Sequence, residues 1–154
     1  MCEMRRILLV ISLLALFACN NDFFNESVVI DNAEWKADNM PFFDINVEDT
    51  VAIYSFSLNV RHLENYKYSN LFVFLHTSFP NGNITHDTIE CVLAFPDGRW
   101  AGRGSGSMRS AEIRLNDNLR FPLKGIYRFE IEQAMREPVL KGITDVGVSV
   151  SKVQ

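Results

Sequence analysis

The chain has 154 residues, of which 47% are apolar, and 15 Lys and Arg against 19 Asp and Glu give a net charge of −4. This length suits a single domain, and the apolar fraction is high enough for a core, which excludes a disordered chain. The acidic balance and the lack of a Lys/Arg cluster argue against nucleic acid as a partner, because binding to phosphates needs a cationic face. The 12 phenylalanines favour a core between β-sheets.

The N-terminus has the pattern of a signal peptide. Arg5 and Arg6 precede an apolar run that extends from Ile7 to Ala18. A membrane-spanning helix needs about 20 residues, so this run predicts a signal peptide over residues 1–18 instead. The tetrad from Leu16 to Cys19 resembles the lipobox of bacterial lipoproteins. We therefore expect Cys19 to be lipidated and to anchor the protein in a membrane, an ordinary signal peptide being the alternative.

The residues after Cys19 bear on where the lipoprotein resides. Position 20 is Asn rather than the Asp of the familiar inner-membrane retention signal, and no acidic run of the kind used for surface export follows. These features favour the outer membrane, with the protein facing the periplasm. We expect residues 19–27 to form a lipidated tether and residues 28–154 to form the folded domain.

Alternation of apolar and polar residues between turn signals predicts strands along the whole domain. In chain order, the predicted strands are Val28–Lys36, Phe42–Val47, Val51–Arg61, Asn70–Phe79, Thr85–Phe95, Ser110–Asn116, Gly125–Gln133 and a last one carrying Val146, Val148 and Val150. The clearest turn is residues 80–83, where Asn-Gly suits a hairpin. Residues 132–141 are the one segment that could be helical, and Pro138 limits it to about one turn.

This pattern predicts an all-β fold, a single antiparallel β-sandwich, jelly-roll-like, with seven or eight strands. A closed barrel is the alternative. Cys91 alternates with Ile89, Leu93 and Phe95, which places it among the inward side chains. We therefore interpret Cys91 as a small core residue and not as a nucleophile.

No constellation of residues indicates catalysis, a metal or a cofactor. Residues 102–107 are rich in Gly and Ser but match no phosphate-binding loop. His62, His76 and His86 are 14 and 10 residues apart, without the close pairing typical of metal ligands on strands. The outward pair Glu130 and Glu132 is more typical of a surface than of a glycosidase. We predict a protein that is not an enzyme and has no metal or cofactor.

Two kinds of binding surface are compatible with the sequence. Trp100, with Tyr66 and Tyr68, could stack on sugar rings, so a carbohydrate-binding lipoprotein is the alternative function. Trp100, Met135 and Arg136 could instead form a protein-docking edge, because Met and Arg are enriched at interfaces. The structural alternative is that Met135 packs into the core.

Four segments together resemble the GldH family, the gliding-motility lipoproteins of Bacteroidetes. They are residues 59–62, 66–71, 96–107 and 121–147, and their order and spacing agree over nearly the whole domain. The resemblance implies an outer-membrane-associated lipoprotein of the gliding apparatus, linked to type IX secretion, with other envelope proteins as partners. It implies no activity and no cofactor, and Cys19 is the one functional residue that it transfers.

Two tripeptides resemble the Asp-Ser/Thr-apolar motif of periplasmic O-glycosylation in Bacteroidetes. They are Asp49-Thr50-Val51 and Asp87-Thr88-Ile89. Thr50 and Thr88 are therefore predicted as O-glycosylation sites.

Overall fold

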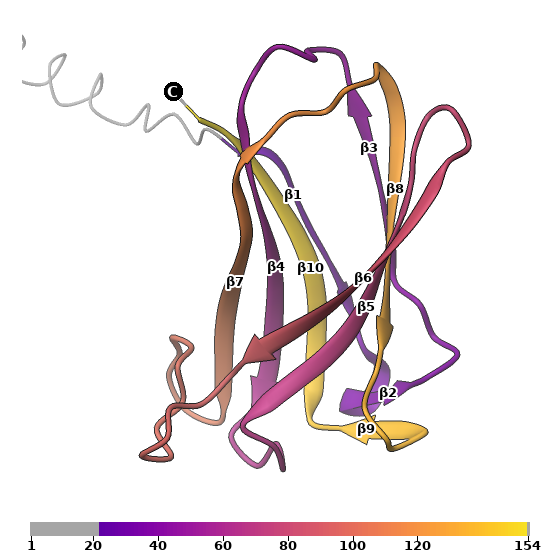
Figure 1. Ribbon diagram of the computed structural model, residues 1–154. Helices are drawn as coiled ribbons and strands as arrows, with labels where there is room; N and C mark the ends of the chain where they lie inside the picture. Colours follow the sequence, from indigo (N-terminus) through magenta and orange to yellow (C-terminus); the bar gives the residue numbers. More distant parts are fainter. Residues whose placement is uncertain (1–21, 154) are drawn as a thin grey trace, which may run out of the picture.

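The computed structural model describes residues 22–153, and this segment folds into two antiparallel four-stranded sheets packed face to face (Figure 1). The first sheet has the order β1 (Asp22–Val29), β10 (Ile143–Lys152), β4 (Tyr54–Leu63), β7 (Met108–Leu119). The second has the order β3 (Phe42–Val47), β8 (Gly125–Gln133), β5 (Asn70–Ser78), β6 (Ile84–Val92). A short ribbon of β2 (Glu34–Lys36) and β9 (Val139–Lys141) lies at one end.

The eight long strands alternate between the sheets except at the β5–β6 hairpin. This alternation gives the two Greek keys of a jelly roll, so the predicted sandwich is confirmed and the barrel alternative is wrong. Each sheet keeps two edge strands, β1 and β7 in the first and β3 and β6 in the second. Within residues 22–153 there is no helix with the length and hydropathy needed to span a bilayer.

The core lies between the sheets and follows the alternation in the sequence. On β8 the side chains of Tyr127, Phe129 and Ile131 are at most 5% exposed, while Arg128 points to solvent and pairs with Asp44 on β3. Full burial of a large apolar side chain contributes about 1.5–3 kcal/mol to folding. One connected core of buried side chains from both sheets thus runs through the described segment.

The turn at residues 80–83 forms as predicted. Gly82 has φ +85°, its N–H donates to the Phe79 carbonyl over 2.9 Å, and the Phe79 N–H donates to the Asn83 carbonyl over 2.8 Å. This turn sets the register of the β5–β6 hairpin, in which Ser78 lies opposite Ile84 and His76 lies opposite His86.

The N-terminal boundary differs from the prediction. β1 begins at Asp22, so the tether expected over residues 19–27 and the domain start expected at Val28 are wrong for residues 22–27, which pair with β10. The predicted strand Val28–Lys36 is interrupted by a 3₁₀ turn, Asp31–Ala33, in which Asn32 and Ala33 have positive φ. The predicted signal peptide, Cys19 and the next two residues lie outside the described residues.

The segment 132–141 contains no helical turn. β8 continues to Gln133, and after a short turn β9 pairs with β2, where Leu140 lies opposite the fully buried Trp35. Cross-strand pairing through Leu140 therefore takes the place of the single helical turn that the sequence allowed.

Candidate functional site

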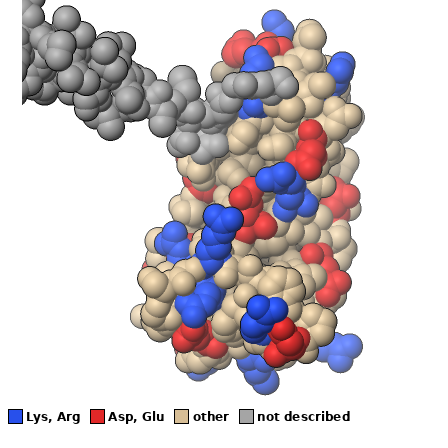
Figure 2. Space-filling model, turned by 90° about the vertical axis from the view of Figure 1, so that its left-hand side faces the viewer, with Lys and Arg blue, Asp and Glu red and all other residues tan. Residues whose placement is uncertain are grey.

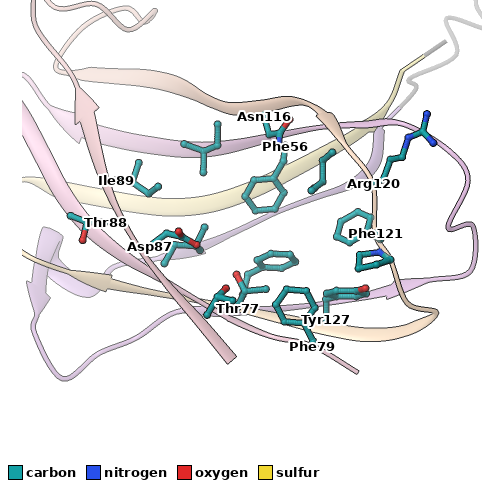
Figure 3. A pocket seen from close by; sticks show the side chains of 16 residues that line it. Phe56, Thr77, Phe79, Asp87, Thr88, Ile89, Asn116, Arg120, Phe121 and Tyr127 are labelled. Carbon is teal, nitrogen blue, oxygen red and sulfur yellow. The ribbon is translucent and has the colours of Figure 1, made fainter. Parts of the chain in front are cut away.

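An apolar groove opens between the edge strands β6 and β7, where the two sheets of the sandwich part (Figure 3). Its volume is about 490 Å³. Its floor consists of inward side chains of β4, β5 and β8, and its sides carry half-buried apolar residues of β6 and β7. The floor residues are Phe56, Leu75, Tyr127 and Phe129, and the side residues are Ile89, Leu115 and Leu119.

Aromatic rings close one end of this groove. Phe121 packs edge-on against Tyr127 with ring centroids 4.9 Å apart, and Phe79 packs on Tyr127 at 5.4 Å. Arg120 lies at this end and Asp87 lies away from it along the groove, as Figure 3 shows. The groove thus has an apolar floor and charges of opposite sign along its length.

The surface on the β7 side carries charges of both signs rather than a field of one sign (Figure 2). On the sheet that contains β7, Arg61 lies 3.6 Å from Asp145 and Arg114 lies 3.4 Å from Asp117. The apolar character of the groove is therefore local, and the outer surface next to it is polar.

The residues predicted to bind sugars lie at the opposite end of the sandwich and pack on one another. Trp100 is half-buried, with its ring 4.5 Å from that of the buried His62, which in turn lies 5.7 Å from Tyr66. Tyr66 is 4% exposed and donates its hydroxyl to the Asn70 carbonyl over 3.0 Å, and burial raises its pKa. These rings form no exposed coplanar platform, which argues against the carbohydrate alternative.

Tyr68 extends this cluster to the surface. Its hydroxyl donates to Oε1 of Glu137 over 2.5 Å, and Lys67 Nζ lies 3.1 Å from the same oxygen. These two hydrogen bonds, first that of Tyr68, hold the pKa of Glu137 below its ordinary value. The hydroxyl of Tyr68 is therefore already hydrogen-bonded within the protein.

The predicted docking residues separate in the structure. Met135 is half-buried against the core, and its sulfur accepts a hydrogen bond from the Phe72 N–H at 3.3 Å. Arg136 is exposed. Among Trp100, Met135 and Arg136, Arg136 alone is an exposed side chain, and the core packing of Met135 favours the structural alternative for that residue.

The other predicted site residues have varied surroundings. Thr88 is exposed on β6, whereas Thr50 is half-buried in the turn before β4, so Thr88 is the more accessible of the two predicted glycosylation sites. Cys91 is fully buried, as predicted, and burial raises the pKa of its thiol to about 12. Cys19 lies outside the described residues.

Two histidines that are ten residues apart in the sequence are in contact in the structure. His76 on β5 and His86 on β6 are directly opposite across the hairpin, with Nδ1 atoms 2.5 Å apart, and Nε2 of His76 lies 2.8 Å from Oε2 of Glu132 on β8. No two of the three histidines are close in the sequence, but the β5–β6 hairpin brings these two into contact. The signal was present in the sequence, because both histidines are five residues from Asn81 in the predicted turn.

Comparison with known proteins gives two curated relatives of similar length. "Gliding motility lipoprotein GldH homolog" of Christiangramia forsetii is 34% identical over 126 residues, which cover 77% of this chain and 78% of the relative. "Gliding motility lipoprotein GldH" of Flavobacterium johnsoniae is 31% identical over 153 residues, which cover 94% of each chain. Neither name describes an enzyme.

A solved chain of the infectious bursal disease virus Gx strain aligns with a TM-score of 0.35 and 10% identity over 85% of this chain and 32% of its own, which is too distant to carry an argument. The family model described as GldH lipoprotein, in contrast, matches residues 22–150, which is nearly the whole sandwich. The resemblance found in the sequence is thereby confirmed: the chain belongs to the GldH lipoprotein family.

Proposed function

We propose that this protein is a non-enzymatic component of the gliding and type IX secretion machinery, anchored by a lipid on Cys19 in the outer membrane and facing the periplasm. Membership of a gliding-motility lipoprotein family and the lipobox-like residues 16–19 support this proposal. Two acyl chains or more on one cysteine provide stable anchoring without a spanning helix.

The anchor also gives the sandwich an orientation. Cys19 precedes β1 by three residues, a stretch of at most about 10 Å. β1 begins beside Tyr54, whose ring lies 5.3 Å from Phe23 and 5.3 Å from Phe121. The end of the sandwich that holds Phe121 therefore faces the membrane, and the end that holds the β2–β9 ribbon points into the periplasm.

The groove between β6 and β7 is where we place the interaction with the machinery. The observation that carries this assignment is an apolar groove bordered by two edge strands, which leaves backbone groups available beside a row of apolar side chains. An extended segment of a partner protein uses both features, because it adds a strand and inserts alternate side chains. The occupant is therefore an extended segment of an envelope protein with alternating apolar residues.

Photo-crosslinking in the native host tests this assignment. A crosslinking amino acid at Ile89, on the side of the groove, is expected to capture an envelope protein of the machinery. The matched control is the same residue at Val92, which is on the same strand and 56% exposed but points away from the groove. Equal capture at both positions, or capture at neither, would contradict the groove as the interaction site.

The anchor and the machinery are tested separately. Cys19→Ala is expected to abolish labelling by palmitate and to release the protein from the outer-membrane fraction. Ile89→Lys is expected to leave the protein in that fraction but to reduce gliding, or secretion in a species that does not glide. Val92→Lys is expected to change neither the localisation nor these functions. Unchanged palmitate labelling of the Cys19 variant would overturn lipidation, and normal gliding and secretion in the Ile89 variant would overturn the role of the groove.

A further inference from the structure

The pair His76 and His86 lies on the outer face of the second sheet, away from the groove floor. Leu75 and Thr77 point into the core, so His76 between them points outward, and the hairpin register places His86 on the same face. Their Nδ1 atoms face each other at 2.5 Å. Two ring nitrogens from adjacent strands thus meet at one point on the surface.

Glu132 determines which nitrogen of His76 is available. The Nε2–H of His76 donates to Oε2 of Glu132 over 2.8 Å, because an ionised carboxylate can only accept. In the neutral ring, Nδ1 then carries the lone pair, and this lone pair points at His86. A carboxylate on the far nitrogen is the arrangement that orients metal-binding histidines and makes them better ligands.

We propose that His76 and His86 bind a divalent transition-metal ion of the zinc or copper type through their Nδ1 atoms. Imidazole suits these ions, whereas magnesium and calcium prefer oxygen ligands, so two ring nitrogens select the zinc or copper type. A tetrahedral zinc ion with Zn–N distances of about 2.0–2.1 Å needs its two nitrogens about 3.3 Å apart. The ring of His86 is exposed on an edge strand. It can therefore rotate outward and widen the 2.5 Å separation of the two Nδ1 atoms to that required without disturbing the core.

Water supplies the remaining ligands. Within residues 22–153 no group of three or more His, Cys, Asp or Glu side chains is arranged to hold an ion. A site of two imidazoles and water binds in an exchangeable manner, unlike a closed structural zinc site with four protein ligands. The ion joins β5 to β6, and β6 is the edge strand that carries Ile89 into the groove. The metal site does not depend on the proposed function of the groove.

Titration of zinc chloride into the purified chain from Asn20 onward, followed by calorimetry, tests this site. This segment contains both sheets of the sandwich and lacks Cys19, whose thiol would compete for zinc. We expect one ion per chain with a dissociation constant in the micromolar range. His76→Ala and His86→Ala should each weaken binding at least 30-fold, with circular dichroism unchanged in the absence of metal.

Two glutamates on β8 provide a matched comparison. Glu132→Gln should weaken binding about tenfold, because the bond that orients His76 is altered. Glu130→Gln removes the same charge two residues away and should change the affinity less than twofold. Copper bound to the wild type should show two coordinating nitrogens in its electron paramagnetic resonance spectrum, and one in either histidine variant.

Four results would overturn the proposal. They are a dissociation constant above 1 mM, wild-type affinity in the His86 variant, equal weakening by both glutamate variants, and a stoichiometry of one ion to two chains.

Discussion

Tyr127 and Leu123 are joined by two hydrogen bonds through one hydroxyl group. The hydroxyl of Tyr127 donates to the carbonyl of Leu123 and accepts from the N–H of the same residue, both over 3.0 Å. This arrangement, like the tyrosine corner of other β-sandwiches, ties the β7–β8 connection to the core. Since Phe121 in that connection packs on the ring of Tyr127, the same contacts close the aromatic end of the groove.

Tyr127→Phe is expected to destabilise the protein by about 1–3 kcal/mol, because it removes both bonds and leaves two backbone groups without their partner. The measurement is the free energy of unfolding from urea titration. The matched control is Tyr54→Phe, since the Tyr54 hydroxyl makes one bond, to the Asp49 carbonyl over 3.2 Å. An effect of Tyr127→Phe no larger than that of the control would contradict the structural role of the two hydrogen bonds to Leu123.

Asp49 gives the protein a measurable sensitivity to acid. Its carboxylate accepts from Lys152 over 2.8 Å and from the N–H groups of Ala52 and Val51 over 3.0 Å, and these bonds lower its pKa to about 2. Because the folded pKa lies below the ordinary Asp value of 3.8, the stabilisation is present above pH 3.8 and is lost as the pH falls toward 2.

Asp49→Asn is therefore expected to lower the melting temperature at pH 6 and to have much less effect at pH 2. Thermal unfolding followed by circular dichroism across this range provides the measurement. Glu48→Gln removes the same charge at the adjacent exposed residue and should leave the profile close to that of the wild type. A constant difference between wild type and Asp49→Asn from pH 6 to pH 2 would show that the carboxylate charge is not the cause.

The strands that the sequence predicted best are those with one face in the core. The bounds of β3 and β8 were predicted residue for residue, because burial of one face imposes strict alternation on both. β1 was missed for the opposite reason. Val28 is 37% and Val29 is 69% exposed, so neither face of this edge strand is fully buried, and its partner β10 lies more than 100 residues away.

The groove could not be predicted from the sequence for a related reason. Ile89 and Leu115 alternate like core residues, and only the order of strands in the two sheets makes β6 and β7 edges that border an opening. The histidine pair was different, since the hairpin at residues 80–83 was predicted correctly. Counting five residues outward from Asn81 would have placed His76 opposite His86.

Gly147 on β10 allows β1 to pair closely. A Cβ atom at this position would lie 2.5 Å from the Glu26 carbonyl oxygen and 2.8 Å from the Ser27 Cβ, both on β1. Gly147→Ala is therefore expected to destabilise the protein by about 1–3 kcal/mol through overpacking. Hydrogen exchange should show faster exchange in β1 than in the wild type, whereas Ser149→Ala, two residues further along β10, should not. Unchanged exchange in β1 of the Gly147 variant would contradict this close approach.

His62 is expected to make the protein less stable as the pH falls from neutral to mildly acidic. Its Nδ1 lies 2.9 Å from the Leu63 carbonyl oxygen, so Nδ1 carries the proton. The other ring nitrogen, Nε2, is buried and has no hydrogen-bond partner within residues 22–153. Burial, more than the nearby Arg109, lowers the pKa of His62 below 6.5, while the bond to Leu63 opposes this change.

The unfolded chain then binds a proton at this residue near pH 6.5, and the folded chain binds it only at lower pH. The free energy of unfolding is consequently highest above pH 6.5. It decreases as the pH falls below this value, by at most about 1.4 kcal/mol per pH unit for one group. His62→Phe keeps a ring against Trp100 but cannot titrate, so its free energy of unfolding should vary less between pH 7 and pH 5. Urea titrations at four pH values would measure the slope, with His86→Ala as the control that retains it. A wild-type slope in His62→Phe would assign the pH dependence to another group.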